Sequence, residues 1–144
     1  MATLTRLFQW EVEGDTLILT PRMDLHDREL PRIEETRRDI LNFLAKTPTK
    51  NVIIDFRATN YFWSSAARLF LRVKKEVYLR KGRMVLCNVS QPLNKILHHP
   101  KLHRQWPICS SREKAVKAIR APHSARNEQR ATARDANESR ESRS

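Results

Sequence analysis

The chain has 144 residues, enough for one domain with a substantial hydrophobic core. It carries 28 Lys and Arg against 16 Asp and Glu, and this formal net charge of +12 favours an acidic partner, nucleic acid or an anionic membrane surface without selecting a fold. No apolar run approaches the length of a signal peptide's core or of a transmembrane helix. The two cysteines, Cys87 and Cys109, lie in expected strands rather than in a paired motif, so we expect small buried hydrophobes and a cytoplasmic protein.

The sequence divides into a folded part and a polar tail. Residues 1–120 hold 23 Lys and Arg against 12 Asp and Glu, so most of the positive charge belongs to the folded part. Residues 121–144 contain only Ala, Pro, Ser, Thr, Asn, Gln, His and charged residues, none of which builds a core. We predict one domain over residues 1–120 and a disordered, Arg- and Ser-rich tail over residues 121–144.

The first third of the chain predicts a β-hairpin followed by a helix. Residues 7–13 alternate between apolar and polar types, a Gly-Asp pair follows, and residues 16–20 form a second apolar run. A helix is expected to begin at Pro31, a residue well suited to the first helical position, and to end before Pro48. Its apolar side chains fall on one face: Ile33, Ile40, Leu41 and Leu44.

The central stretch predicts a buried strand and a half-buried helix. Residues 51–56, Asn-Val-Ile-Ile-Asp-Phe, form a short β-branched run typical of a parallel strand. Beyond Asn60, apolar residues recur at helical spacing with basic residues between them, up to Gly82, which is expected to stop the helix. Ser64 and Ser65 lie between strand and helix. A serine hydroxyl at this point is expected to be the helix N-cap, accepting a hydrogen bond from a first-turn amide.

The last third predicts two more strand and helix pairs. Residues 83–88 form a short apolar strand, and Ser90 is placed to cap the helix that follows. Residues 106–109 predict a last short strand, and the Ser-Ser-Arg-Glu pattern of residues 110–113 is a capping box that opens a final helix. The inner face of that helix carries Ala115, Val116 and Ile119. The order predicts an α/β fold: a mixed, mostly parallel sheet of about five strands with an N-terminal hairpin, covered by about four helices.

Three pieces of sequence, in this order and spacing, resemble the STAS domain family of bacterial anti-anti-sigma factors and related transporter and stressosome modules. They are Val52-Ile-Ile-Asp55 followed by Ser64-Ser65, then Gly82-Arg-Met-Val-Leu-Cys-Asn-Val-Ser90, then Trp106-Pro-Ile-Cys-Ser110 leading into Glu113-Lys-Ala115. The resemblance covers residues 7–119. It implies the STAS fold and a regulatory role carried by protein interaction.

In the family, the loop before the central helix usually reads Asp-Ser-Ser-Gly or Asp-Ser-Thr-Gly. A hydroxyl in it is phosphorylated by a partner serine kinase that is also the anti-sigma factor. The matching positions here are Trp63, Ser64, Ser65 and Ala66, so both serines are kept while the acid and the glycine are replaced. The resemblance therefore implies Ser64 and Ser65 as phosphorylation candidates and an anti-sigma factor or serine-protein kinase as partner. One serine acting as an N-cap and the other as a filler is the alternative.

Two groups of side chains beside the serines are candidates for contact with the partner. The aromatic group is Tyr61, Phe62 and Trp63, of which we expect at least one to pack in the core. The basic group is Arg68, Arg72 and Lys75, spaced to line one side of the central helix and meet an acidic surface. With Trp63 in place of the acid, phosphorylation-independent docking is a second hypothesis.

Catalysis, metal binding and cofactor binding have little support in the sequence. His98, His99 and His103 are the only residues that suggest a metal site, but Pro100 interrupts the helix between them and no cysteine or close carboxylate completes a ligand set. The chain has only two glycines, which excludes a Gly-rich phosphate loop, and no base is recognisably paired with the serines. We expect a non-enzyme without metal or cofactor. Two further hypotheses remain: a constitutive regulatory subunit of a transporter or other complex, and a basic nucleic-acid-binding protein.

Overall fold

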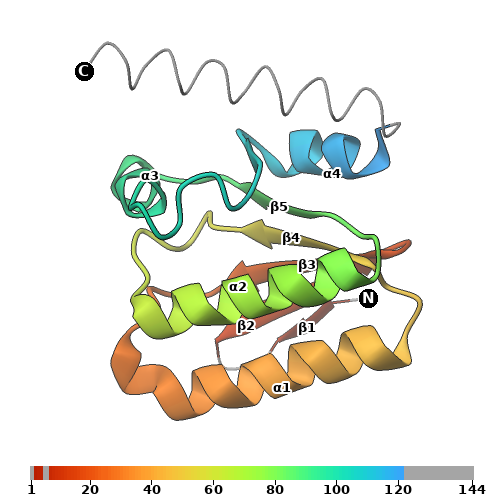
Figure 1. The fold of residues 1–144 in the computed structure, drawn as a ribbon, viewed down its shortest axis with the longest axis horizontal. Coiled ribbons are helices and arrows are strands. Elements are labelled where there is room, and N and C mark those ends of the chain that lie inside the picture. Colours follow the sequence, from red (N-terminus) through yellow and green to blue (C-terminus); the bar gives the residue numbers. More distant parts are fainter. Residues whose placement is uncertain (1, 5–6, 122–144) are drawn as a thin grey trace.

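The computed structural model describes residues 2–4 and 7–121, and the predicted polar tail lies almost wholly outside this range (Figure 1). The strands are β1 (Ala2–Leu4), β2 (Phe8–Glu13), β3 (Thr16–Pro21), β4 (Asn51–Asp55), β5 (Met84–Cys87) and β6 (Ile108–Cys109). The helices are the 3-10 helix η1 (Asp27–Glu29) and the α-helices α1 (Leu30–Lys46), α2 (Ser64–Leu79), α3 (Gln91–Leu97) and α4 (Arg112–Arg120). Within the described residues, no helix is both long and apolar enough to cross a membrane.

The strands form one mixed sheet in the order β1-β2-β3-β4-β5-β6. β1, β2 and β3 are antiparallel, whereas β3 to β6 are parallel. The predicted α/β class, the N-terminal hairpin and the element order are confirmed. The structure adds β1, which pairs along the free edge of β2. Its three residues are too few to show the alternation by which a strand is recognised in a sequence.

The two faces of the sheet are covered differently. Successive parallel strands are added in one direction, and right-handed crossovers then place the connecting helices on one face. α1 and α2 lie side by side on that face, over the main core (Figure 1). α4 follows the last strand and packs on the opposite face. Its smaller cluster contains Ile18, Ile53, Val85, Cys87, Ala115 and Ile119.

The helix ends confirm one predicted cap and correct two. The Ser90 hydroxyl accepts a hydrogen bond from the Leu93 amide and caps α3 as expected. α4 is capped by Ser111 and not by Ser110, which puts Lys114 rather than Glu113 at the third helical position, so the predicted capping box does not form. Gly82 ends α2 for a different reason than expected. The left-handed residue is Lys81, at φ 60°, while a Cβ at Gly82 would lie 1.7 Å from the Lys50 carbonyl oxygen. Glycine is required there for space.

Candidate functional site

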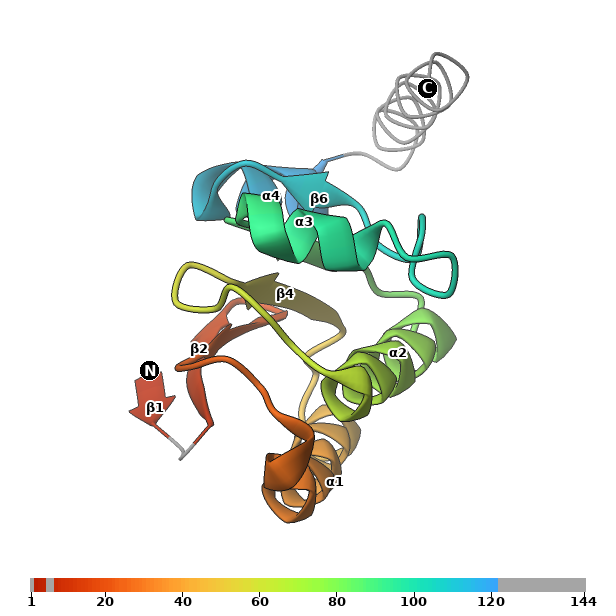
Figure 2. The same cartoon turned by 90° about the vertical axis from the view of Figure 1, so that its left-hand side faces the viewer.

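The segment that precedes α1 and the loop that precedes α2 run side by side at the end of the sheet where the parallel strands terminate (Figure 2). Both leave the carboxyl ends of neighbouring parallel strands, β3 and β4, which meet at the same edge. The Leu25 amide donates to the Tyr61 carbonyl at 3.2 Å, and the Trp63 amide donates to the Leu25 carbonyl at 2.9 Å. These bonds join the two connections into a short parallel bridge between Leu25 and Phe62.

Two side chains fasten the loop before α2 to its neighbour. One carboxylate oxygen of Asp24 accepts from the Asn60 amide at 2.8 Å and from the Tyr61 amide at 3.3 Å. The Thr59 hydroxyl, only 1% exposed, donates to the Met23 carbonyl at 3.2 Å. Because the Asn60, Tyr61 and Trp63 amides are all hydrogen-bonded to the neighbouring segment, the loop holds its side chains in defined positions.

The two candidate serines occupy different environments in the first turn of α2. Ser64 is exposed, whereas Ser65 is buried at 4% exposure. Neither is the N-cap. That position belongs to Trp63, whose side chain makes no capping hydrogen bond. The prediction of a capping serine hydroxyl is therefore wrong, because α2 begins one residue earlier than that role requires.

The cap comes instead from Asp27, in η1. Its Oδ1 accepts from the Ser65 amide at 3.0 Å and from the Ser65 hydroxyl at 2.7 Å, while its Oδ2 accepts from the Ser64 hydroxyl at 3.4 Å. The Ser65 hydroxyl and amide lower the pKa of Asp27 most, desolvation opposes them, and Ser64 and Arg68 lower the pKa by lesser amounts. An anion at the start of a helix is also favoured by the helix dipole. No local sequence pattern indicates this cap, since Asp27 and Ser64 are 37 positions apart.

The three predicted aromatic residues have separate places. Phe62 is 2% exposed and packs in the core against Phe56 and Phe70, so it is the one that packs inside. Tyr61 is 40% exposed and its ring lies 4.0 Å from that of the half-buried Trp63. Trp63 also stacks on His26, with ring centroids 3.9 Å apart. We call His26, Tyr61 and Trp63 the aromatic cluster.

The structure brings two of the three predicted basic residues together. Arg68 and Arg72 line a shallow groove of about 270 Å³ between α1 and α2, with the Ser65 end of α2 at its edge. Arg72 also pairs with Glu76 at 3.4 Å. Lys75 is exposed and does not line this groove. The groove is therefore basic on the α2 side, next to the serines.

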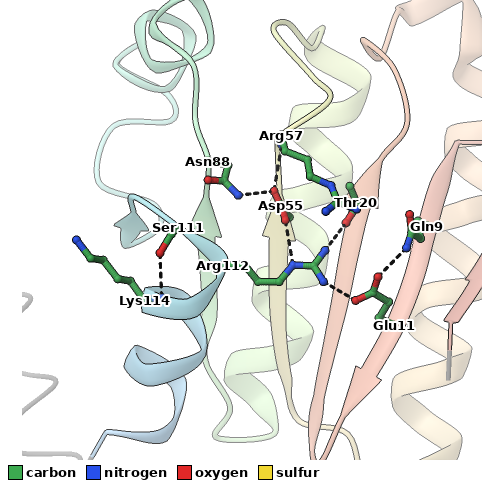
Figure 3. A network of polar contacts seen from close by, with 9 residues as sticks. All are labelled: Gln9, Glu11, Thr20, Asp55, Arg57, Asn88, Ser111, Arg112 and Lys114. Carbon is green, nitrogen blue, oxygen red and sulfur yellow. Dashed lines mark hydrogen bonds and ion pairs between the residues drawn. The ribbon is translucent and has the colours of Figure 1, made fainter.

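A second polar network, which the sequence did not indicate, lies on the opposite face of the sheet (Figure 3). Asp55, 1% exposed at the end of β4, accepts from Arg112 at 3.0 Å and from the Asn88 amide group at 2.9 Å. Arg112 reaches on from the start of α4 to Glu11 on β2 and to Thr20 on β3. Burial alone would lower the pKa of Arg112, but its hydrogen bonds to Asp55 and Glu11 raise it. This network ties α4 to three strands.

The remaining candidates form no site of their own. Among residues 2–4 and 7–121, no group of three His, Cys, Asp or Glu side chains is arranged to hold a metal ion, and the rings of His98 and His103 lie 5.8 Å apart. A larger open hollow of about 780 Å³ lies at the amino ends of the parallel strands, away from the serines. Its lining includes Lys50 and Arg83, but Lys50 lies 3.9 Å from Asp15 and Arg83 donates to carbonyls at the end of α4.

Comparisons with known proteins agree with this architecture. The family model of the STAS domain matches residues 8–115. No curated protein matches the sequence significantly. A Thermotoga maritima structure assigned as an anti-sigma factor antagonist is similar with a TM-score of 0.71 and 16% identity, over 81% of this chain and 97% of that one.

The Bacillus anti-sigma factor antagonist SpoIIAA is also similar, in two forms. Its unphosphorylated form gives a TM-score of 0.68 at 22% identity, over 78% of this chain and 96% of the other. Its phosphorylated form gives 0.61 at 21% identity, over 78% of this chain and 98% of the other. At these identities the structural likeness shows the fold alone.

Proposed function

Because the chain belongs to the STAS domain family, we propose that it is a non-catalytic regulatory module that docks onto an anti-sigma factor or a related serine kinase. The docking surface consists of the aromatic cluster and the first turn of α2, with Arg68 and Arg72 beside them. Trp and Tyr are enriched at the centres of protein interfaces, and Arg suits an acidic partner surface.

The observation that carries the proposal is the exposed Ser64 hydroxyl in the first turn of α2, next to the aromatic cluster. A kinase must reach the hydroxyl that it modifies, and Ser65 is nearly enclosed at 4% exposure. We therefore assign Ser64 as the phosphoacceptor and Ser65 as a structural residue. The similar SpoIIAA has been solved in both phosphorylation states.

Phosphorylation of Ser64 would release the partner through desolvation. A phosphoserine carries about −1.5 to −2 charges at pH 7. In water this charge is solvated, but in an interface built on Tyr61 and Trp63 it would lose much of that solvation, and an acidic partner surface that meets Arg68 and Arg72 would repel it. Arg68 and Arg72 lie further along α2 and serve the unmodified complex.

The test is affinity capture from a lysate of the source organism, followed by mass spectrometry of retained proteins and of phosphorylated residues. The baits are the wild type, Ser64→Glu, Ser64→Ala as the matched uncharged control, and Trp63→Ala. We expect an anti-sigma factor or serine kinase to be retained by the wild type and by Ser64→Ala, and lost by Ser64→Glu and Trp63→Ala.

Other results would redirect the assignment. Equal retention of one partner by all four baits would reject both the phosphorylation switch and the docking surface. A transporter subunit retained by the wild type, Ser64→Ala and Ser64→Glu but lost with Trp63→Ala would identify a constitutive regulatory subunit. Retention that collapses between 50 and 200 mM salt together with co-purifying nucleic acid would favour the nucleic-acid hypothesis.

A further inference from the structure

Asp27 already places a negative charge beside the Ser64 hydroxyl, with a carboxylate oxygen 3.4 Å from the Ser64 oxygen. α2 has no acidic residue in its own first turn and no side-chain cap at Trp63. Asp27 fills this role from η1, with one carboxylate oxygen on the Ser65 amide and hydroxyl and the other on the Ser64 hydroxyl. The N-terminus of α2 is thus occupied by an anion before any modification takes place.

Modification of Ser64 would remove one of these contacts and add a competitor. In the kinase reaction the Ser64 oxygen attacks the terminal phosphorus of a nucleoside triphosphate, an O–P bond forms, the bond to the nucleoside diphosphate leaving group breaks, and the hydroxyl proton passes to the kinase's base. The ester oxygen can no longer donate to Asp27. The new phosphate oxygens are acceptors for the same first-turn amide, and they are attached to an atom 3.4 Å from the Asp27 carboxylate.

We propose that Asp27 is a built-in competitor for the anion position at the start of α2, and that phosphorylation of Ser64 expels its carboxylate and releases η1. This rests on the proposed function for the identity of Ser64 as the acceptor. It adds a displacement of the neighbouring segment to the charge change at the serine.

The contacts of η1 explain why this segment would move while its neighbours stay. None of the three residues of η1 is buried, and no side chain caps its start at His26. Leu25, just before it, is buried and bonded to the loop on both sides, and Asp24 holds two further loop amides. The release is therefore confined to residues 26–29, and the pair of Glu29 with Arg32 at the start of α1, 2.6 Å long and partly exposed, keeps the end of η1 attached.

This displacement would reach the docking surface through one ring contact. His26 stacks on Trp63 at 3.9 Å, so a shift of η1 uncovers one face of the Trp63 ring. Phosphorylation would then alter both the charge and the shape of the aromatic cluster. If Asp27 only stabilised the start of α2 and did not compete with the phosphate, the stack of His26 on Trp63 would stay in place.

The test is a double-mutant cycle on the isolated full-length chain, with no partner or kinase present. Phosphoserine is installed at position 64 by genetic code expansion in the wild type and in Asp27→Asn, and each is compared with its unmodified counterpart. Asp27→Asn keeps the shape of the side chain and an oxygen acceptor for Ser65 while removing the charge. The readouts are the thermal midpoint and hydrogen exchange of the Glu29 and Leu30 amides, which bond to the His26 and Asp27 carbonyls.

We expect phosphoserine to lower the thermal midpoint of the wild type by roughly 3–6 °C and to accelerate exchange at Glu29 and Leu30 about tenfold. In Asp27→Asn the phosphate should take over the helix end, leaving the midpoint unchanged or raised and the exchange rates unaltered. Equal effects of phosphoserine in the two backgrounds would overturn the proposal.

Two further variants keep the result unambiguous. Asp24→Asn is the matched control, because Asp24 binds the Asn60 and Tyr61 amides of the same loop and not the serines, so it should leave the phosphoserine effect intact. Asp27→Ser provides a second uncharged acceptor should Asp27→Asn fold poorly. The cycle is independent of the capture experiment. If no partner is captured, a difference between the phosphoserine effects in the wild type and in Asp27→Asn would still support the competition at the start of α2. If that difference is absent, a captured partner would still support the proposed function.

Discussion

Asp27 and Asp55 are both aspartates that fix the start of a helix, but they do so with opposite chemistry. Asp55 is 1% exposed and bound to the guanidinium of Arg112, the first residue of α4. Asp27 is exposed and bound to the neutral hydroxyl and amide groups at the start of α2. The first contact is an ion pair with a buried carboxylate and a partly exposed guanidinium, and the second is a charge-assisted cap in contact with water.

The difference separates a part of the molecule that must stay fixed from one that is able to change. Breaking the Asp55 contact would leave an uncompensated charge inside the protein, which is costly. Breaking the Asp27 contact returns its carboxylate to solvent, which costs much less because water replaces the lost donors. The proposed docking surface lies beside the Asp27 contact. A covalent modification there could rearrange that contact at a low cost in free energy.

The largest expected effect is at Arg112. Arg112→Met should destabilise the fold by about 3–5 kcal/mol, because it strands the buried charge of Asp55. Urea unfolding measures the loss. The control is Arg37→Met, which removes a solvent-exposed pair with Glu34 and should cost about 0–1 kcal/mol. Adding Asp55→Asn to Arg112→Met should recover part of the loss, and equal costs for Arg112→Met and Arg37→Met would contradict the distinction between the two regions.

The next effect concerns binding. Once the partner is identified, Trp63→Ala should weaken its binding by about 2 kcal/mol or more, roughly thirtyfold, while the fold stays intact. Isothermal titration calorimetry of purified components measures the dissociation constant. Lys75→Ala, an exposed change on α2 outside the groove, is the control and should have little effect. A larger effect of Lys75→Ala than of Trp63→Ala would place the interface on another side of α2.

Of the predicted local caps only that of Ser90 is confirmed, and the sequence missed the contacts that join distant segments. Ser90 was recognisable as the cap of α3 because its partner amide, that of Leu93, is three residues away. Asp27 and Ser65 are 38 residues apart, and Asp55 and Arg112 are 57 residues apart, so no helical or strand period relates them. Knowing that β3 and β4 are parallel neighbours would have brought Asp27 and Ser65 near the same edge.

Individual side chains show the same limit. The short β-branched run of β4 predicted a buried strand, but it could not show that Asp55 faces Arg112 on the α4 side of the sheet. Three aromatics in a row were recognisable as a mixture of core and surface residues. The buried one, Phe62, pairs with Leu25 in a bridge between two distant segments, and a sequence pattern does not show such a pairing.

A smaller effect is expected for the serine that Asp27 holds most closely. Ser65→Ala removes the 2.7 Å hydrogen bond to Asp27 and should cost about 1 kcal/mol of unfolding free energy. Ser64→Ala, whose exposed hydroxyl makes only a 3.4 Å contact, should cost clearly less in the same urea titration. Equal costs would mean that Ser65 is no more structural than Ser64, and the assignment of their roles would fail.

The smallest expected effect is a dependence of stability on pH that belongs to Asp27. Its pKa in the folded chain is lowered, chiefly by the Ser65 hydroxyl and amide, below the value of about 3.9 for an unfolded aspartate. A lowered carboxyl pKa contributes stability that is fully present above the unfolded pKa and is lost as pH falls through the folded pKa. The thermal midpoint of the wild type should therefore exceed that of Asp27→Asn by a constant amount near neutral pH. The gap should narrow as the solution is acidified below about pH 4.

In a Ser65→Ala background the main cause of the lowered pKa of Asp27 is gone, so the pH dependence of this difference in thermal midpoint should flatten. A gap that stays constant down to pH 2 in the wild-type background would show that the cap at the start of α2 does not depend on charge, and the competition with phosphate would lose its electrostatic basis.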